Sequence, residues 1–96
     1  MVYEWDPAKS AANVKKHRIS FEEAASVFFD AEALTFRDPD HSDEEEREIT
    51  IGRSARRRVL FVAHVGRNGR IRIISARRAT RQERRQYEEG IGEATR

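Results

Sequence analysis

The residues of this chain that are best suited to chemistry are the arginines of segment 70–78. Its sequence, RIRIISARR, alternates arginine with isoleucine and ends in an arginine pair. Alternation places successive side chains on opposite faces of a β-strand. The pattern predicts one face with Ile71, Ile73 and Ser75 and another with Arg70, Arg72, Ile74 and Ala76. Such a strand would present guanidinium groups, whose planar fork pairs well with phosphate, on one face of a sheet.

Positive charge beside a few proton-carrying groups is enough for one reaction, the attack of an RNA 2′-hydroxyl on its own neighbouring phosphate. The substrate supplies the nucleophile, so the protein needs only to accept a proton, donate a proton and stabilise the dianionic transition state. Arginine suits charge stabilisation because its guanidinium stays protonated. The candidates for this role are Arg72, Arg77 and Arg78, with Arg78 as a residue that binds the RNA.

Three side chains are candidates for moving the protons. His64 lies near the end of an apolar strand and titrates close to neutral pH, so it could act as acid or base. Its parity, shared with Leu60 and Val62, fits a buried core histidine at least as well. Glu83 and Tyr87 are one helical turn apart and could enter the same site. The alternatives are helix capping for Glu83 and helix anchoring for Tyr87.

A further set of polar residues lies on a helix predicted over 7–17, PAKSAANVKKH. Asp6-Pro7 is typical of an N-cap followed by proline at the first helical position. On spacing alone, an ordinary solvated face is favoured over a binding surface. The polar stripe consists of Lys9, Asn13, Lys16 and His17, and the apolar side that could lie close against a sheet consists of Ala8, Ala11 and Ala12.

The charge of the chain is distributed unevenly. Residues 1–48 hold 6 lysines and arginines against 13 acidic residues, whereas residues 49–96 hold 13 arginines, no lysine and 4 acidic residues. Asymmetry of this kind indicates nucleic-acid contact. Arginine codons of a GC-rich genome, with the arginines merely solvating a surface, explain the composition equally well.

The composition also excludes several classes of function. The chain has 96 residues, 38 % of them hydrophobic and 38 % charged, and no cysteine. Disulfides, thiolate nucleophiles and cysteine-ligated zinc are therefore excluded, and the three histidines have no zinc-like spacing. No apolar run is long enough to span a membrane, and the first residues do not resemble a secretory signal. We expect a cytoplasmic protein without metal or cofactor.

The remaining segments predict how these residues are positioned. A capping box at Ser20–Glu23 begins a second helix that ends near Asp30, and Asn68-Gly69 closes a hairpin. Apolar or alternating runs predict strands over 2–5, 34–36, 47–52, 59–65 and 70–78. The run 59–65 is apolar on both faces, which marks a central strand. We predict a single α+β domain over 1–96, with two N-terminal helices packed on a small antiparallel meander that a C-terminal helix closes.

Two segments outside the sheet complete this prediction. Thr80–Glu83 is a second capping box, and it begins a helix of about ten residues that ends near Gly90. Its only sizeable apolar residue is Tyr87, so the helix either packs through that ring and arginine stems or is fixed by a partner. Residues 91–96 should fray. The acidic segment 37–46 lacks the ligand spacing of a Ca²⁺ loop, and we predict a solvated, mobile loop.

Several separated motifs, taken in order, resemble one known family. They are Glu4-Trp5-Asp6-Pro7-x-Lys9, Asn13-x-x-Lys16-His17-x-Ile19-Ser20-Phe21-Glu22-Glu23-Ala24, Glu46-Arg47-x-Ile49-x-Ile51-Gly52, Ile74-Ser75-Ala76-Arg77-Arg78-Ala79 and Glu83-Arg84-x-x-Tyr87. This arrangement is similar to that of the BrnT toxins and covers nearly the whole chain up to about residue 89. Position 18 is arginine where many relatives have glycine, a departure at the helix corner and away from the candidate site.

The resemblance implies a ribonuclease toxin of a type II toxin–antitoxin pair, with a RelE-like fold. This fits the metal-independent endoribonuclease that the arginine-lined site predicts. It implies two partners, an RNA substrate and a BrnA-type ribbon-helix-helix antitoxin, the latter in a heterotetramer that represses its own promoter DNA. It also implies site roles at matching positions, namely RNA binding for Lys9, Asn13, Lys16 and His17, and catalysis for Arg77, Glu83 and Tyr87. His64 and Arg72 are added from the chemistry above.

The sequence leaves two alternatives to the toxin. A non-catalytic arginine-rich module that grips nucleic-acid phosphates needs only charge, whereas the enzyme also needs groups that move protons. A purely structural partner of a DNA-binding protein suits the polar final helix, and it is compatible with the toxin. His64, Glu83 and Tyr87 favour the enzyme, and the family resemblance favours it more strongly.

Overall fold

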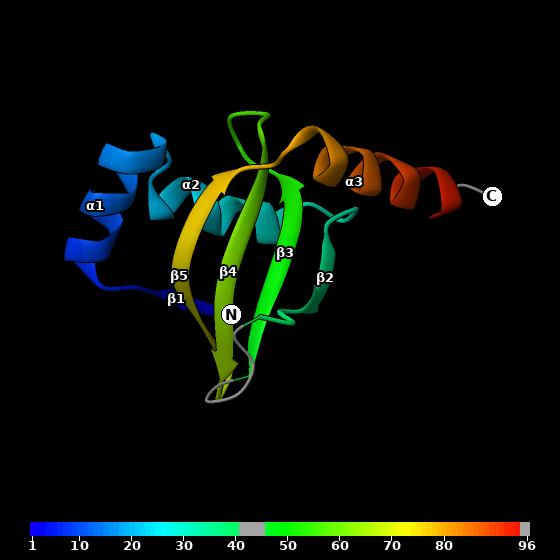
Figure 1. Cartoon of the computed structure of the whole chain (residues 1–96). Helices are drawn as coiled ribbons and strands as arrows, with labels where there is room; N and C mark the ends of the chain where they lie inside the picture. Colours follow the sequence, from blue (N-terminus) through cyan, green and yellow to red (C-terminus); the bar gives the residue numbers. More distant parts are fainter. Residues whose placement is uncertain (41–45, 95–96) are drawn as a thin grey trace.

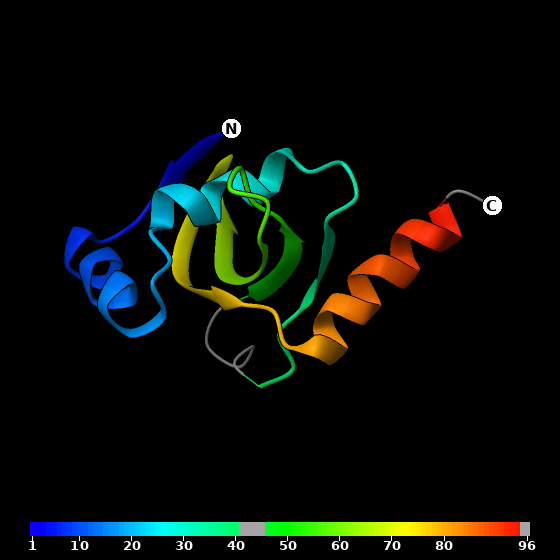
Figure 2. The ribbon, with the colours of Figure 1, turned by 90° about the horizontal axis from the view of Figure 1, so that it is seen from above.

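The strands of the described residues, 1–40 and 46–94, form one curved sheet in the computed structural model (Figures 1 and 2). Their order in the sheet is β1-β5-β4-β3-β2, so β4 is the central strand, as its apolar sequence predicts. The α+β class is confirmed. Along the chain the elements are β1 (Val2–Glu4), α1 (Pro7–His17), α2 (Phe21–Ser26), a 3₁₀ turn (Val27–Phe29), β2 (Leu34–Arg37), β3 (Arg47–Arg53), β4 (Val59–Arg67), β5 (Arg70–Arg78) and α3 (Arg81–Ala94).

The strands β2 to β5 form the predicted antiparallel meander. The Asn68-Gly69 turn has the expected positive φ angles, 54° and 75°. This two-residue turn fixes the register of β4 against β5. The short β1 adds a parallel strand at the β5 edge, which no sequence pattern reveals because no hairpin turn links the two strands.

The pairing of β4 with β5 contains a β-bulge. Ala63 pairs with Ser75 and His64 pairs with Ile73, so Ile74 is the extra residue. A bulge reverses the alternation of the residues that follow it. The predicted faces of this strand are therefore wrong beyond Ile74, because Ala76 is buried in the same cluster as Ile73 while Ser75 is exposed.

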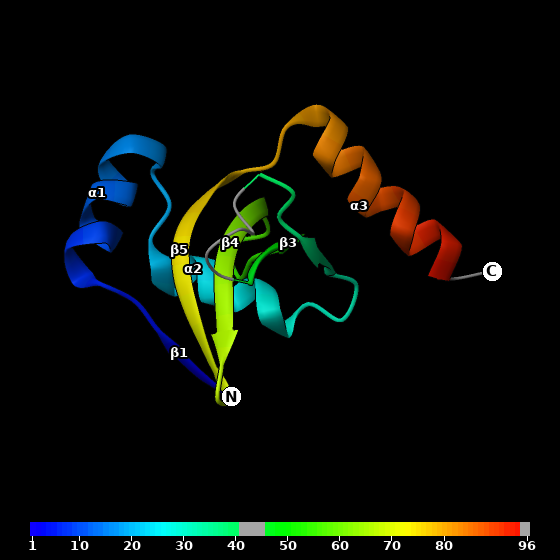
Figure 3. The ribbon, with the colours of Figure 1, turned by 60° about the horizontal axis from the view of Figure 1, so that its bottom comes forward.

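The two faces of the sheet are covered differently. The face that carries Leu60 and Val62 packs against α2 and the 3₁₀ turn, and it is called the α2 face below. The opposite face carries Phe61, Val65 and Arg72, and it is called the arginine face. Figure 3 shows α1 and β1 beside β5 at one edge of the sheet and α3 at the other side, near β2.

The second helix begins with only half of the predicted capping box. The Glu23 N–H donates to the Ser20 Oγ at 3.0 Å, as expected for an N-cap. The Glu23 carboxylate does not return to Ser20, because it accepts from the Ser54 Oγ at 2.7 Å and forms an ion pair with Arg58. These contacts lower the pKa of Glu23 despite its burial, and they tie α2 to the β3–β4 hairpin.

The first helix has the predicted bounds and the predicted Asp6 cap, but its apolar side is not packed on the sheet. Ala8, Ala11 and Ala12 are all exposed. The only buried residue of α1 is Asn13. The helix ends at Arg18, which has a φ of 62°, a left-handed conformation that glycine adopts more easily.

The last helix keeps its predicted start and extends beyond its predicted end. The Thr80 and Glu83 groups cap each other reciprocally, at 2.9 and 3.2 Å. The helix continues to Ala94 because Gly90 is not a C-cap here. A Cβ at Gly90 would lie 2.9 Å from Leu34 Cδ2, so the glycine allows α3 to approach β2 closely.

Two predictions concern segments that the structure describes only in part. Residues 41–45 of the acidic loop and residues 95–96 of the tail lie outside the described residues. Within the described part of the chain, no helix is long and apolar enough to cross a membrane.

Candidate active site

A row of directly paired residues crosses four strands at one end of the sheet. Arg47 in β3 lies opposite Val65 in β4, and Val65 lies opposite Arg72 in β5. Arg72 in turn lies opposite Glu4 in β1. Directly paired neighbours project from the same face of a sheet. The register therefore brings Arg47, Arg72 and Glu4 together on the arginine face.

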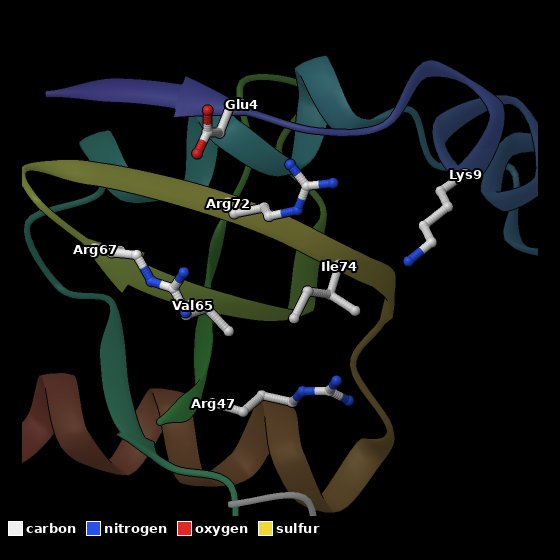
Figure 4. A pocket seen from close by; sticks show the side chains of 7 residues that line it. All are labelled: Glu4, Lys9, Arg47, Val65, Arg67, Arg72 and Ile74. Atoms are coloured by element: carbon white, nitrogen blue, oxygen red, sulfur yellow. The ribbon is translucent and has the colours of Figure 1, made fainter. Parts of the chain in front are cut away.

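This row forms the floor of a pocket of about 400 Å³ (Figure 4). Lys9 reaches it from the first turn of α1, which follows β1 after only two residues. Four cations and a single carboxylate line the pocket, so its potential favours anions such as phosphate. The lining residues are Glu4, Lys9, Arg47, Val65, Arg67, Arg72 and Ile74.

The bulge brings Arg77 to the same face. Arg77 lies opposite Phe61, which shares the parity of Val65, and its guanidinium carbon is 3.9 Å from the centre of the Phe61 ring. Its two terminal nitrogens donate to the two carboxylate oxygens of Glu83, at 2.8 and 2.9 Å. Arg77 is thereby held in a fixed orientation, half-buried on the arginine face.

Glu83 is fully engaged as an acceptor. The hydrogen bonds from Arg77 lower the pKa of the Glu83 carboxyl, and the Thr80 N–H adds to that effect. A carboxylate with these partners stays ionised and has no proton to donate at neutral pH. The structure therefore shows the capping role that the sequence left open, together with a role in orienting Arg77.

Tyr87 anchors α3 to the rest of the molecule. Its side chain is 2 % exposed, and its hydroxyl donates to Asp30 Oδ2 at 2.6 Å. Burial and the Asp30 carboxylate raise the pKa of the Tyr87 hydroxyl. The helix thus packs through its one large ring, the first of the two arrangements that its composition predicts, and the phenol is directed away from the pocket toward Asp30.

His64 lies on the opposite side of the sheet from the pocket. It follows Ala63 and precedes Val65 in β4, so it projects from the α2 face, where its ring lies edge-on to Phe28. It is 3 % exposed, and its Nε2 is 2.8 Å from Thr50 Oγ1. Burial lowers the pKa of His64 to about 4. The structure does not bring His64 together with Arg72 and Arg77.

The buried position of His64 should make the stability of the fold depend on pH. Because the folded-state pKa lies below the ordinary value of 6.5, the unfolded chain takes up a proton before the folded chain does. The contribution of neutral His64 to the stability of the fold is fully present above pH 6.5 and is lost as the pH falls toward 4. Between pH 7 and pH 5 we expect the free energy of unfolding to fall by about 2 kcal/mol, measured by urea denaturation.

A His64→Leu variant is the control for this pH dependence. It lacks the titrating group, so most of the loss between pH 7 and pH 5 should disappear. Glu23, Asp30 and Glu83, whose carboxyl pKa values are lowered, weaken the fold only at still lower pH. An equal loss of stability in the wild type and in His64→Leu would show that His64 does not cause the pH dependence.

The other predicted residues lie on α1 or on the α2 face, and none of them lines the pocket. Asn13 is buried, and its Nδ2 donates to the carbonyl oxygens of Ile19 and Ala76, each at 2.8 Å. The Ala76 N–H donates back to Asn13 Oδ1 at 3.2 Å. Arg78 is exposed opposite Leu60, on the α2 face. Two positions of α1 lie further along the helix and outside the pocket lining, the exposed Lys16 and the half-buried His17.

Of the predicted residues, the pocket contains Lys9 and Arg72, with Arg77 and Glu83 on the same face. The sequence reasoning missed Glu4, Arg47 and Arg67 as site residues. The position of Arg67 could have been predicted from the Asn68-Gly69 turn, because a two-residue turn fixes which residues of β4 and β5 are opposite each other. No local signal places Glu4 beside β5.

The fold and the pocket define a small α+β protein with a cationic site on one face of its sheet. The family model for the ribonuclease toxin BrnT of type II toxin–antitoxin systems matches residues 5–83. The chain belongs to this BrnT ribonuclease toxin family, which confirms the resemblance seen in its motifs.

The fold is shared with a solved structure. The crystal structure of the Brucella abortus ribonuclease toxin BrnT, at 1.1 Å resolution, has a TM-score of 0.64 to this chain and 22 % sequence identity. The match covers 84 % of this chain and 100 % of the Brucella chain. No curated protein sequence matches the chain.

Proposed function

We propose that this chain is a metal-independent endoribonuclease toxin that cuts RNA by attack of a 2′-hydroxyl on the adjacent phosphate, and thereby inhibits translation and growth. The observation that carries the proposal is the pocket on the arginine face, where four cations surround the place for a phosphate. Family membership supports it, since the family is one of ribonuclease toxins.

In this proposal the cations divide into two roles. Lys9, Arg47 and Arg72 bind the phosphate and its neighbours, because they line the pocket. Arg77, oriented by Glu83, stabilises the negative charge that develops on the phosphate oxygens in the transition state. Asn13, His64 and Tyr87 hold the scaffold, because their polar atoms contact protein groups away from the pocket.

The test is incubation of the purified protein with total RNA in excess EDTA. We expect cleavage, with 2′,3′-cyclic phosphate and 5′-hydroxyl ends, and cleavage at least tenfold slower in Arg72→Ala because a pocket cation is lost. The matched control is Arg56→Ala, which removes the same charge from an exposed position in the hairpin at the other end of β4. Products with 3′-hydroxyl ends, or cleavage that stops in EDTA, would contradict the mechanism.

One observation favours a second candidate function, a non-catalytic module that binds nucleic-acid phosphates. Each proton carrier predicted from the sequence, His64, Glu83 and Tyr87, is engaged with another protein group. Intact RNA that nevertheless binds the folded protein with a strong salt dependence would support this candidate. It would equally fit a toxin that cuts only on the ribosome, which assays with purified ribosomes distinguish.

Membership in a type II toxin–antitoxin family implies an antitoxin partner. We propose a BrnA-type ribbon-helix-helix protein for that role, in a heterotetramer that represses its own promoter DNA in the cytoplasm, on the basis of the family resemblance. Co-purification of the chain with the product of the adjacent gene, and sizing of the complex, tests this partner.

A further inference from the structure

The pocket on the arginine face contains one carboxylate, a group of the kind that can serve as a general base. Its lining consists of four cations, two aliphatic side chains and the carboxylate of Glu4. Arginine is a poor proton acceptor because it stays protonated. Cleavage through a 2′-hydroxyl nevertheless requires removal of that proton, and general base catalysis requires a base within hydrogen-bonding reach of it. Among the lining residues, Glu4 is therefore the candidate for the general base.

The other carboxylate on the arginine face does not fill this role. Both oxygens of Glu83 accept from Arg77, and one also accepts from the Thr80 N–H. By contrast, the contact that the structure gives the Glu4 carboxylate is a long ion pair, 3.4 Å from its Oε2 to Arg70 Nη1. Glu4 retains part of its exposure, so it has free acceptor sites for a substrate hydroxyl.

The position of Glu4 is set by the sheet. Its strand β1 pairs with β5 in parallel, and Glu4 lies opposite Arg72 in that pairing. Figure 4 shows the Glu4 carboxylate at the β1 side of the pocket, next to the Arg72 side chain, with the Lys9 amine facing the same space from α1. A phosphate held by Arg72 would thus have a carboxylate on one side and an ammonium on the other.

We infer that Glu4 is the general base of the RNA cleavage and that Lys9 is the general acid, an inference that rests on the proposed ribonuclease function. The Glu4 carboxylate takes the proton of the 2′-hydroxyl while the 2′-oxygen forms a bond to phosphorus. The bond from phosphorus to the 5′-oxygen breaks with its electron pair, and that oxygen takes a proton from the Lys9 ammonium. The products are a 2′,3′-cyclic phosphate and a 5′-hydroxyl, and exchange with water then returns both side chains to their starting states.

The test compares single-turnover cleavage of a short RNA that the wild type cuts, with the enzyme in saturating excess. Glu4→Gln should lower the rate about 100-fold or more, the effect typical of a lost general base. Its affinity for an all-2′-O-methyl RNA of the same sequence, which cannot be cut, should be unchanged or tighter because a negative charge has gone. Glu4→Ala should regain rate when formate is added, since formate supplies the missing carboxylate.

The matched control is Arg70→Gln, which breaks the ion pair of Glu4 but leaves the carboxylate in place. We expect its rate to stay within threefold of the wild type. If Arg70→Gln is as slow as Glu4→Gln, or if Glu4→Gln cuts at the wild-type rate, Glu4 is not the base although the ribonuclease function stands. If the folded wild type cuts RNA neither free nor on purified ribosomes, the proposed function fails, and the assignment of Glu4 fails with it.

Discussion

Asn13→Ala should lower the free energy of unfolding by about 3 kcal/mol, because it leaves three buried backbone groups without partners. The groups are the carbonyls of Ile19 and Ala76 and the N–H of Ala76. Few other contacts would compensate, since Asn13 is the only buried residue of α1. Urea denaturation at pH 7 measures the loss.

The same variant should weaken RNA cleavage more than its stability explains. Asn13 and Lys9 are one turn apart on α1, and Asn13 is bonded to the residue next to Arg77. Its amide therefore holds the Lys9 side of the pocket against β5. Val14→Ala, at the neighbouring exposed position, is the control and should change stability by less than about 0.5 kcal/mol. Equal stabilities of the two variants would show that the amide does not hold α1.

Arg77→Ala should reduce RNA cleavage by about 100- to 1,000-fold while the protein remains folded, because one preorganised charge that stabilises the transition state is lost. Arg77 is half-buried and contacts Phe61 and Glu83, so a modest loss of stability accompanies the change. Single-turnover cleavage at saturating protein, together with a thermal unfolding curve, separates the two effects. Full activity in a folded Arg77→Ala protein would remove Arg77 from the site.

Glu83 provides the control for this prediction. If Glu83 only orients Arg77, Glu83→Gln should cost about tenfold in cleavage, and the double variant should be no slower than Arg77→Ala alone. Additive losses in the double variant would instead mean that Glu83 acts on the RNA independently of Arg77.

Local sequence rules were sufficient for most element boundaries. The bounds of α1, its Asp6 cap, the Ser20 cap and the Asn68-Gly69 turn all follow from residues within four positions of one another. The apolar pattern likewise identified β4 as the central strand, because a strand that is buried on both faces is apolar at nearly every position.

The site depends on contacts between distant parts of the chain, and these were not predictable from local patterns. Asn13 looks like a member of a solvated stripe, yet it is buried because unpaired backbone groups of β5 lie against it. The carboxylate of Glu23 binds Arg58 instead of completing its own capping box. His64 lies on the face opposite the pocket, although it is next to the pocket residue Val65 in the strand. Glu4 enters the site only because β1 pairs with the last strand of the sheet.

Because Ile74 is an extra residue, the side chains of β5 alternate between the two faces in one phase before Ile74 and in the opposite phase after it. Arg72 and Arg77 are five positions apart, and in a regular strand an odd spacing would place them on opposite faces. If Ile74 were instead paired with Ala63 in a ladder without a bulge, Arg77 would lie opposite Leu60 and point into the core under α2. Deletion of Ile74 would remove the bulge and leave Arg77 opposite Phe61, because its spacing from Arg72 would become even. For this sheet, the number of residues between the two arginines matters as much as their identity.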